Sequence, residues 1–389
     1  MKYIDLSGTY RVQLEDGSEY AAVLPGSLDT NGIGKKETVA VKWHPDAAID
    51  ETGTFKDCGR ILTRFTRKHT YEGKAVFSRS LTVEPDGCRL FVESERSRKL
   101  SLRVNGQDIP PYEQGTVSTP HVFEITEYVH CGKNEFEFTC DNSYKGWPHD
   151  PIVFSSAATD ETQTNWNGCI GYLRIRAERA SFIADIRIYP NLRTVDIAVD
   201  MDSAENATKI ICIRSDAFGK VSKNVSFKKG RSTIWMKGIP LRPDVCRWDE
   251  GEGNLYEVKV NADGFEEKKV SFGVRTVGVR GGRFTLNGRT VFLRCETNSA
   301  LFPETGFWPV DKQSWIEILE KYRAYGANCV RFHSHCPPMA AFDAADEIGM
   351  LMQPELSHWN PKTAFENDTD YAYYRLELAQ LLKILANHP

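Results

Sequence analysis

The stretch of residues 286–356 constrains the fold more than any other part of the chain. Three short apolar runs, at residues 291–296 (VFLRCE), 327–333 (ANCVRFH) and 350–355 (MLMQPE), alternate in it with two segments of helical periodicity. Strands that alternate with helices in this way are typical of consecutive βα units on a parallel sheet. The pattern therefore predicts a parallel sheet with helices packed on it.

Start and stop signals for helices lie between these runs. Asp311 can cap the first helix, and Gly326 can end it in a left-handed conformation. The Pro337–Pro338 pair suits the first turn of the second helix, which Gly349 can end. Apolar residues recur at helical spacing in the first segment, at Trp315, Ile318, Leu319 and Tyr322.

Polar side chains recur at every second position along the three runs, although strands of a parallel barrel are usually buried on both faces. They are Arg294, Glu296, Arg331, His333, His335, Gln353 and Glu355. In a closed barrel these side chains would line the interior near the C-terminal rim, where barrel enzymes hold their active sites. The pattern predicts a polar pocket of sugar size. The competing interpretation is an ion-pair network, in which Arg294 or Arg331 neutralises Glu296 or Glu355.

Before residue 276 the chain has many short alternating strands and no strong helix signal. Asn105-Gly106, for example, predicts a tight hairpin turn. Residues 1–190 are predicted to form a β-sandwich of jelly-roll type, and residues 191–275 an immunoglobulin-like β-sandwich. Residues 276–389 are predicted to be the first part of a (β/α)8 TIM barrel, with about three of its eight βα units.

Two loops of the first predicted domain carry tryptophan beside amides and a carboxylate. They are NSYKGWPHDP with Trp147 and ETQTNWNGCIG with Trp166, and Asn142, Asp150 and Asn165 lie nearby in the sequence. An aromatic face flanked by hydrogen-bonding groups suits a pyranose ring. A tryptophan in such a loop equally serves as a core plug, and the sequence leaves both interpretations open.

Composition excludes several classes of function. The net charge of -4 gives no basic footprint for nucleic acid, and no run reaches the roughly 18 apolar residues of a membrane span. The N-terminus has no signal segment, so we expect a cytoplasmic protein, or a periplasmic or secreted one from which a signal was removed. The ten cysteines form no CxxC pair, which predicts reduced thiols. His333 and His335 lack a third ligand, so no metal or cofactor is expected. A homo-oligomer is compatible with this composition.

Three strings carry a resemblance to a known family. NGRTVFLRCETN, GANCVRFHSHCPP and EIGMLMQPEL resemble the start of the catalytic barrel in glycoside hydrolase family 2, the family of β-galactosidases, β-glucuronidases and β-mannosidases. The preceding segments follow the same order, so the resemblance covers essentially all 389 residues. It implies a jelly-roll domain, an immunoglobulin-like spacer and a catalytic barrel that is incomplete here.

The resemblance also implies the chemistry. The family hydrolyses terminal β-linked sugars of oligosaccharides and glycosides by a retaining mechanism, with two glutamates that would lie beyond Pro389. The chain alone is therefore expected to be inactive. Substrate contacts are expected at Arg331, His333, His335, Glu355, Glu296, Asn298, Trp359 and Trp166.

The chain departs from the commoner family pattern at two places. It reads RCETNSA where many members read RGVNRHE, and SHCPP where SHYPP is usual, which puts simple galactosidase specificity in doubt. Uronic acids are another substrate class, for which Arg331 could bind the carboxylate. The alternative function is a non-catalytic carbohydrate-binding or interaction protein of the same architecture. A catalytic pair made of Glu296 and Glu355 themselves is a further, less favoured alternative.

Overall fold

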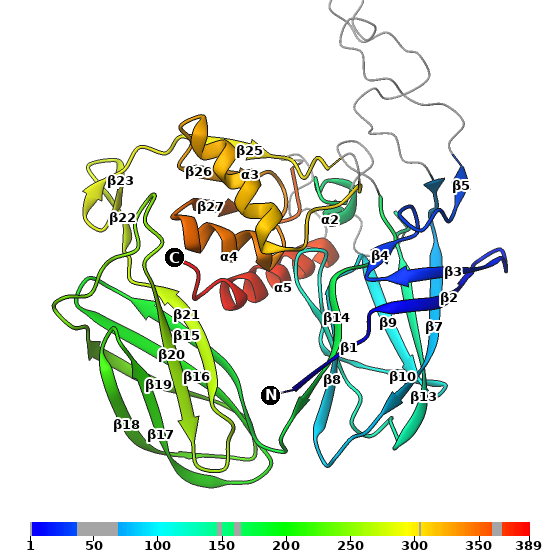
Figure 1. The fold of residues 1–389 in the computed structure, drawn as a ribbon, viewed down its shortest axis with the longest axis horizontal. Coiled ribbons are helices and arrows are strands. Elements are labelled where there is room, and N and C mark those ends of the chain that lie inside the picture. The colour runs from blue at the N-terminus through cyan, green and yellow to red at the C-terminus, as the bar shows by residue number, and fades with distance from the viewer. Residues whose placement is uncertain (1, 37–68, 146–149, 159–164, 303–304, 360–367) are drawn as a thin grey trace, which may run out of the picture.

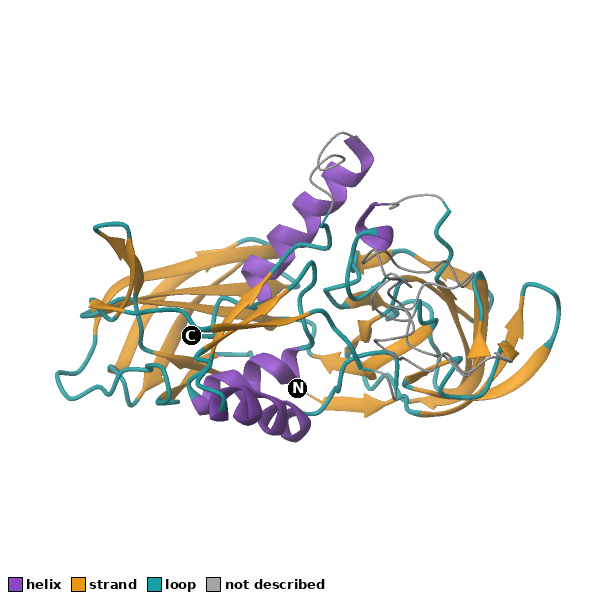
Figure 2. Ribbon diagram, turned by 90° about the horizontal axis from the view of Figure 1, so that it is seen from above, coloured by secondary structure: helices purple, strands orange, loops and turns teal. Residues whose placement is uncertain are grey.

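A computed structural model of the chain describes residues 2–36, 69–145, 150–158, 165–302, 305–359 and 368–389. Most of its elements are antiparallel strands, and they form two β-rich regions (Figure 1). Seen from above, the helices gather between these two regions (Figure 2). No helix in the described ranges combines the length and the apolar character that crossing a bilayer requires.

Two antiparallel sheets that share one apolar core make up the first β-rich region, which we call the first sandwich. One sheet has the order β1 (Lys2–Asp5), β14 (Gly168–Glu178), β8 (Arg89–Arg96), β12 (His121–Glu124) and β11 (Pro111–Glu113), and β4 (Gly26–Ser27) also pairs with β14. The other has the order β10 (Gln107–Ile109), β9 (Lys99–Val104), β13 (Gly132–Asp141), β7 (Lys74–Val83), β2 (Gly8–Leu14) and β3 (Glu19–Leu24). A short pair, β5 (Lys35–Lys36) and β6 (His69–Thr70), lies beside them.

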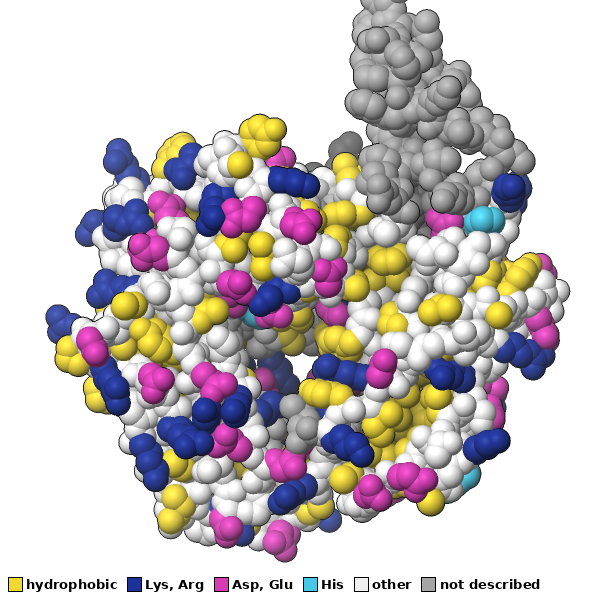
Figure 3. Space-filling model, in the orientation of Figure 1, with side chains coloured by type: hydrophobic (Ala, Val, Ile, Leu, Met, Phe, Trp, Pro, Cys, Tyr) yellow, Lys and Arg dark blue, Asp and Glu magenta, His cyan; other side chains and the backbone are white. Residues whose placement is uncertain are grey.

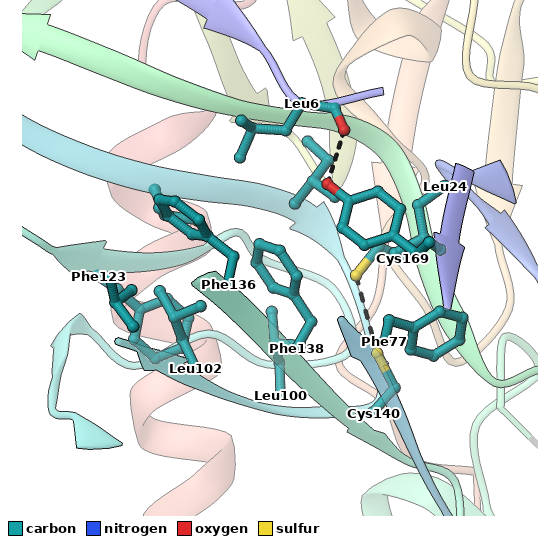
Figure 4. Close-up of a cluster of buried hydrophobic side chains, with 14 of the residues drawn as sticks. Leu6, Leu24, Phe77, Leu100, Leu102, Phe123, Phe136, Phe138, Cys140 and Cys169 are labelled. Carbon is teal, nitrogen blue, oxygen red and sulfur yellow. Dashed lines mark hydrogen bonds between the residues drawn. The ribbon is translucent and has the colours of Figure 1, made fainter. Parts of the chain in front are cut away.

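The core of the first sandwich follows from strand alternation. Every second side chain of β2, β9 and β13 is buried, as the period of a half-buried strand requires. Rings from β7 and β13 meet aliphatic side chains from both sheets (Figure 4). The hairpin turn predicted at Asn105-Gly106 is confirmed: both residues have positive φ, and they join β9 to β10.

Seven strands form the second β-rich region, the second sandwich. A three-stranded sheet has the order β15 (Phe182–Pro190), β16 (Thr194–Ser203) and β19 (Gly230–Pro240). A four-stranded sheet has the order β18 (Gly219–Phe227), β17 (Ala207–Ser215), β20 (Leu255–Ala262) and β21 (Lys268–Gly273). The sequence-based boundary at residue 190 assigns β15 to the first domain, but β15 pairs along its length with β16 and its isoleucines lie in the second core. The pairing corrects that assignment.

The third region begins with a small meander of β22 (Val277–Arg280), β23 (Arg283–Leu286) and β24 (Arg289–Thr290). A parallel sheet follows, in the order β25 (Cys295–Asn298), β26 (Cys329–Phe332) and β27 (Leu351–Pro354), with α3 (Lys312–Ala324), α4 (Met339–Ile348) and α5 (Asp368–Ile384). Both predicted helix signals of α3 are present, since Asp311 accepts from the Ser314 amide and Gly326 has positive φ. Gly349 ends α4 in the left-handed region.

The first parallel strand begins later than the sequence predicts. Residues 291–294 are not in a strand, and β25 starts at Cys295. The amide of Val291 donates to the Phe284 carbonyl, and Val291 packs against Trp248 and Leu286. Val291 and Leu293 therefore belong to the small cluster beside the meander, whereas Phe292 is exposed.

Candidate active site

An ion pair joins the ends of the second and third parallel strands. Arg331 Nε on β26 lies 2.6 Å from Glu355 Oε1, directly after β27, and both side chains are partly exposed. The other oxygen, Oε2, accepts the backbone amide of Ser334 at 2.8 Å. Both carboxylate oxygens are thus fixed by donors. This is the ion pair that the competing interpretation of the sequence expected.

Ser334 lies in a turn that the first sandwich holds in place. Its φ of 53° is in the left-handed region, and its hydroxyl donates to Ser156 Oγ at 2.9 Å. Ser156 returns a backbone hydrogen bond to Ser334 Oγ at 2.9 Å, and Ser155 Oγ donates to the Ser334 carbonyl at 3.0 Å. Ser156 Oγ also lies 3.1 Å from Nδ1 of His333. The orientation of His333 therefore depends on a segment about 180 residues earlier in the chain.

Aromatic rings continue the rim beyond His333. The Trp359 ring stacks on His333 with centroids 6.0 Å apart and planes at 20°. The ring of Phe154 meets that of Trp359 edge-on, with centroids 6.0 Å apart. The hydroxyl oxygen of Tyr374 lies 2.8 Å from Nδ1 of His358. Such a wall offers an apolar face beside polar groups, which is the surface that a sugar ring requires.

His335 lies beneath this rim. It is 0% exposed, and its Nδ1 is 2.9 Å from the His333 carbonyl, so Nδ1 carries the proton and donates. Its ring packs against Trp308 and Phe332. Burial lowers the pKa of His335 to about 4, so the ring is neutral near pH 7. With no exposed surface, His335 supports the turn from below in this structure.

Glu296 and Asn298 lie on the other face of the sheet. In the parallel register Glu296 pairs with Val330 and Thr297 with Arg331, so Thr297 shares the face of Arg331. Asn298 donates to the Tyr322 hydroxyl on α3 at 3.4 Å. The expectation that Glu296 and Asn298 join Arg331 is wrong here, because a shift of one residue reverses every side chain of a strand.

Trp166 lies in the interior and not on the rim. It is 3% exposed, the guanidinium of Arg98 lies 4.7 Å from its ring, and its indole nitrogen donates to the Ala157 carbonyl. The core-plug interpretation of the sequence describes this position. Asn142 and Asn165, also expected near a sugar, are buried and bonded to each other's backbone. Trp147 lies outside the described residues.

Several residues of the site carry no signal in the sequence. Ser155, Ser156 and Phe154 follow the short helix α2 (Asp150–Val153), and nothing in their local pattern points to His333. Thr297 shares the face of Arg331 only because the register places it there, whereas Gln353 on this face follows the predicted alternation. A parallel pairing scheme for residues 295–298 would have found Thr297.

One group of side chains in the described ranges could hold a metal ion. Ligand atoms of Asp343, Asp346 and His388 lie within 4.8 Å of one another. His388 Nδ1 already lies 2.7 Å from Asp346 Oδ2, and burial raises the pKa of both carboxyl groups. A cation would have to replace this hydrogen bond. None of the three residues belongs to the rim around Arg331.

Comparisons with known proteins agree on one class of enzyme. An exo-β-D-glucosaminidase of Amycolatopsis orientalis is 26% identical over 345 residues, which cover 79% of this chain and 32% of that protein. A putative β-glucuronidase of Formosa agariphila is 24% identical over 341 residues, covering 83% and 30%. The chain thus spans about a third of the length of these curated relatives. No family model matches it.

Solved structures share the whole fold. A glycoside hydrolase family 2 β-galacturonidase from Eisenbergiella tayi, bound to galacturonate, matches with a TM-score of 0.76 at 16% identity, covering 100% of this chain and 64% of that one. The exo-chitosanase of Amycolatopsis orientalis matches with a TM-score of 0.71 at 18% identity, covering 100% and 48%. The relatives found by sequence are glycosidases, and the solved structures of the same fold include a glycosidase of glycoside hydrolase family 2, so the chain is similar to these enzymes.

Proposed function

We propose that this chain is the N-terminal part of a retaining β-glycosidase that removes terminal β-linked sugars. Residues 2 to about 180 would be its jelly-roll domain, the second sandwich its immunoglobulin-like spacer, and the third region the first part of its TIM barrel. The observation that carries the proposal is the rim at the C-terminal ends of β26 and β27. There Arg331, Glu355 and His333 stand beside Trp359, on the side where barrel enzymes bind substrate.

The exposed apolar residues of the third region support an incomplete barrel. β25 and β27 each pair on one side only within the described chain. Phe292, Tyr325 and Leu382 are 77%, 94% and 67% exposed, which is unusual for a finished core. Further strands of a longer protein would cover these surfaces and supply the two glutamates, which retaining glycosidases hold about 5–5.5 Å apart.

Substrate contacts are proposed for Arg331, Glu355, His333 and Trp359. His335 would act by holding the turn that carries His333. Oligosaccharides and glycosides would be the substrates. Cytoplasmic location and homo-oligomeric assembly stay predictions from the sequence.

Uronic acids are a second candidate class of substrate, favoured by one feature of Arg331. Its Nε is bonded to Glu355, whereas its two terminal nitrogens have no hydrogen-bond partner in the part of the chain that the structure describes. A guanidinium edge of this kind binds carboxylates in a bidentate manner. The β-galacturonidase among the structural relatives is consistent with this class.

The test is an assay of the complete natural protein against aryl β-galactoside, β-glucuronide, β-galacturonide and β-glucosaminide. We expect the protein to hydrolyse at least one of these substrates. NMR of the released sugar should show that the configuration at its anomeric carbon is retained. Arg331→Gln should lower kcat/KM by about 10²-fold or more if the sugar is a uronide. Arg214→Gln, at an exposed ion pair of the second sandwich, is the matched control. Hydrolysis by the 389-residue chain that requires Glu355 would overturn the proposal, and so would a complete protein without glycosidase activity.

A further inference from the structure

A cavity of about 250 Å³ lies at the centre of the molecule, where its three regions meet. Strands of both sandwiches and the helix α5 contribute to its wall. In the space-filling view the molecule is hollowed at this place, with charged side chains around the opening (Figure 3). The residues of the rim around Arg331 are absent from its lining, so the cavity is separate from the candidate active site.

Positive charge exceeds negative charge in the wall of the cavity. Three carboxylates line it, together with five cations: Arg174, Arg176, Arg231, Lys268 and Lys383. Burial lowers the pKa of Lys268, and its Nζ donates to the Ala184 carbonyl at 2.5 Å.

Each of two carboxylates in the wall is shared by two cations. Glu93 accepts from Arg174 at 2.9 Å and from Arg176 at 2.5 Å. Glu113 accepts from Arg231 at 3.1 Å and lies 3.5 Å from Lys383 Nζ. The third carboxylate, Asp185, is already bonded to Arg187. Two cations have a further partner behind the wall, since Arg176 pairs with Glu178 at 2.9 Å and Arg231 lies 3.8 Å from Asp202. Among the described residues, Arg174 and Lys383 each pair only with a carboxylate that a second cation shares. Their positive charge is thus compensated only in part within a partly enclosed space, which attracts an anion.

Arg174 is the best placed of these cations to bind a ligand. Its guanidinium lies 3.9 Å from the ring centroid of Tyr3 and 3.9 Å from that of Tyr172, between the two rings. Its Nε is bonded to Glu93, and its two terminal nitrogens have no hydrogen-bond partner among the residues that the structure describes. Two aromatic faces and one carboxylate thus fix a guanidinium whose outer edge is available.

The remaining wall favours an organic anion over a small inorganic one. Val122, Phe182 and Ala184 contribute apolar surface, and the Tyr172 hydroxyl has no hydrogen-bond partner in the described ranges. The volume suits a molecule of about monosaccharide size. We propose that this cavity binds a small hydroxylated carboxylate of the uronic-acid class, with its carboxylate on the outer edge of Arg174 and a hydroxyl at Tyr172. A ligand in this place contacts all three regions at once.

Titration calorimetry on the 389-residue chain tests this site. Sodium D-galacturonate is expected to bind saturably, whereas D-galactose, which lacks the carboxylate, and inorganic phosphate, which lacks the carbon frame, are expected to bind at least about tenfold more weakly. Arg174→Gln is expected to weaken galacturonate binding by at least about tenfold. Tyr172→Phe removes only the hydroxyl and is expected to weaken it less.

Arg214→Gln, which changes an exposed ion pair of the second sandwich, is the control and is expected to bind galacturonate as the unmodified chain does. The proposal is overturned if galacturonate does not bind, if galactose or phosphate binds equally well, or if Arg174→Gln folds and binds galacturonate with unchanged affinity. Should Arg174→Gln fail to fold, unchanged affinity in Tyr172→Phe overturns the hydroxyl contact, and the galacturonate–galactose comparison still tests the carboxylate. The outcome is independent of the hydrolytic activity proposed above.

Discussion

Two interiors of this molecule are built in opposite ways. The core of the first sandwich is almost entirely apolar: Phe77, Phe136 and Phe138 are 0% exposed, and the buried hydroxyl of Tyr10 finds its acceptor within the same sandwich (Figure 4). The interface of the turn at residues 333–339 with β8 and with Ser155 and Ser156, which we call the seam, is polar although most of it is buried.

Hydrogen bonds between the first sandwich and the third region fill the seam. Arg96, which is 0% exposed, donates to the Pro337 carbonyl at 3.0 Å and to the Glu95 carbonyl at 2.9 Å. The carboxylate of Glu95 accepts a hydrogen bond of 3.2 Å from the backbone amide of Met339, which is the first residue of α4. Since the N-cap residue Pro338 offers no side-chain acceptor, a carboxylate of another region caps this helix.

The apolar core and the polar seam contribute differently to the stability of the fold and to the position of the turn at residues 333–339. An apolar core stabilises in proportion to the area it buries, and it accepts many partners. A buried hydrogen bond contributes little net stability, but the loss of one partner leaves the other unsatisfied. We therefore expect the core to determine how stable the sandwich is, and the seam to determine where the turn with His333 lies.

The largest effect is expected from the core. Phe138→Ala removes a fully buried ring and should lower the free energy of unfolding by about 3–5 kcal/mol. Urea unfolding followed by tryptophan fluorescence measures this change. Phe284→Ala is the matched control, because its ring is 53% exposed, and a change within about 0.5 kcal/mol is expected there. Equal losses in both variants would remove the distinction between core and surface.

Acid is expected to act on two buried histidines, His335 in the seam and His121 on β12, and not on the apolar core. Burial lowers the pKa of His121 and of His335 to about 4, whereas the unfolded chain has the ordinary value of 6.5. Between these values the unfolded state binds more protons, so stability is complete above pH 6.5 and is lost as the pH falls towards 4. The slope is at most about 1.4 kcal/mol per pH unit for each histidine, or about 2 kcal/mol each at pH 5.

Urea unfolding at pH 7.5, 6 and 5 measures this dependence. Glu377 acts in the opposite sense, because burial raises its pKa and the folded state then favours its proton at low pH. His335→Asn should flatten the loss between pH 6.5 and 5, whereas replacement of the exposed His130 should leave it unchanged. A stability that is constant from pH 7.5 to 5 in the unmodified chain would contradict buried neutral histidines.

Arg96 tests the seam directly. Arg96→Met keeps much of the volume but leaves the carbonyls of Glu95 and Pro337 without their donor, at a cost of about 1–3 kcal/mol. The same change at Arg11, an exposed partner of Glu19, should have no measurable effect on unfolding. If Arg96→Met is as stable as the unmodified chain, the seam is not held by this guanidinium.

The two interiors also differ in how far the sequence predicts them. Alternation along β9 and β13, the Asn105-Gly106 turn and the cap at Asp311 are local patterns, and the structure contains all three. The sequence also allows the ion pair of Arg331 and Glu355 to be predicted, because both residues lie near the ends of consecutive apolar runs.

Contacts between residues that are far apart in the sequence cannot be predicted from such local patterns. The face on which Glu296 lies depends on where β25 begins, and the apolar run at residues 291–294 gives the wrong start. Ser156 touches His333 across about 180 residues, and no local pattern records such a contact. The burial of His335 depends on Trp308, which precedes α3 in the chain. Patterns of period two and 3.6 thus predict which elements form, but not which side chains of distant elements meet.

The smallest expected effect comes from one hydroxyl of the seam. Ser156→Ala removes the acceptor of Ser334 Oγ and the partner of His333 Nδ1, while the backbone bond from residue 156 to Ser334 can persist. The free energy of unfolding should fall by about 1 kcal/mol. Ser226→Ala, at an exposed hydroxyl pair with Thr208, is the control and should change nothing measurable. The decisive reading is NMR of the His333 ring: if the seam sets position more than stability, its nitrogen shifts change clearly in Ser156→Ala despite the small loss of stability. Unchanged shifts would mean that the Trp359 stack alone orients this histidine.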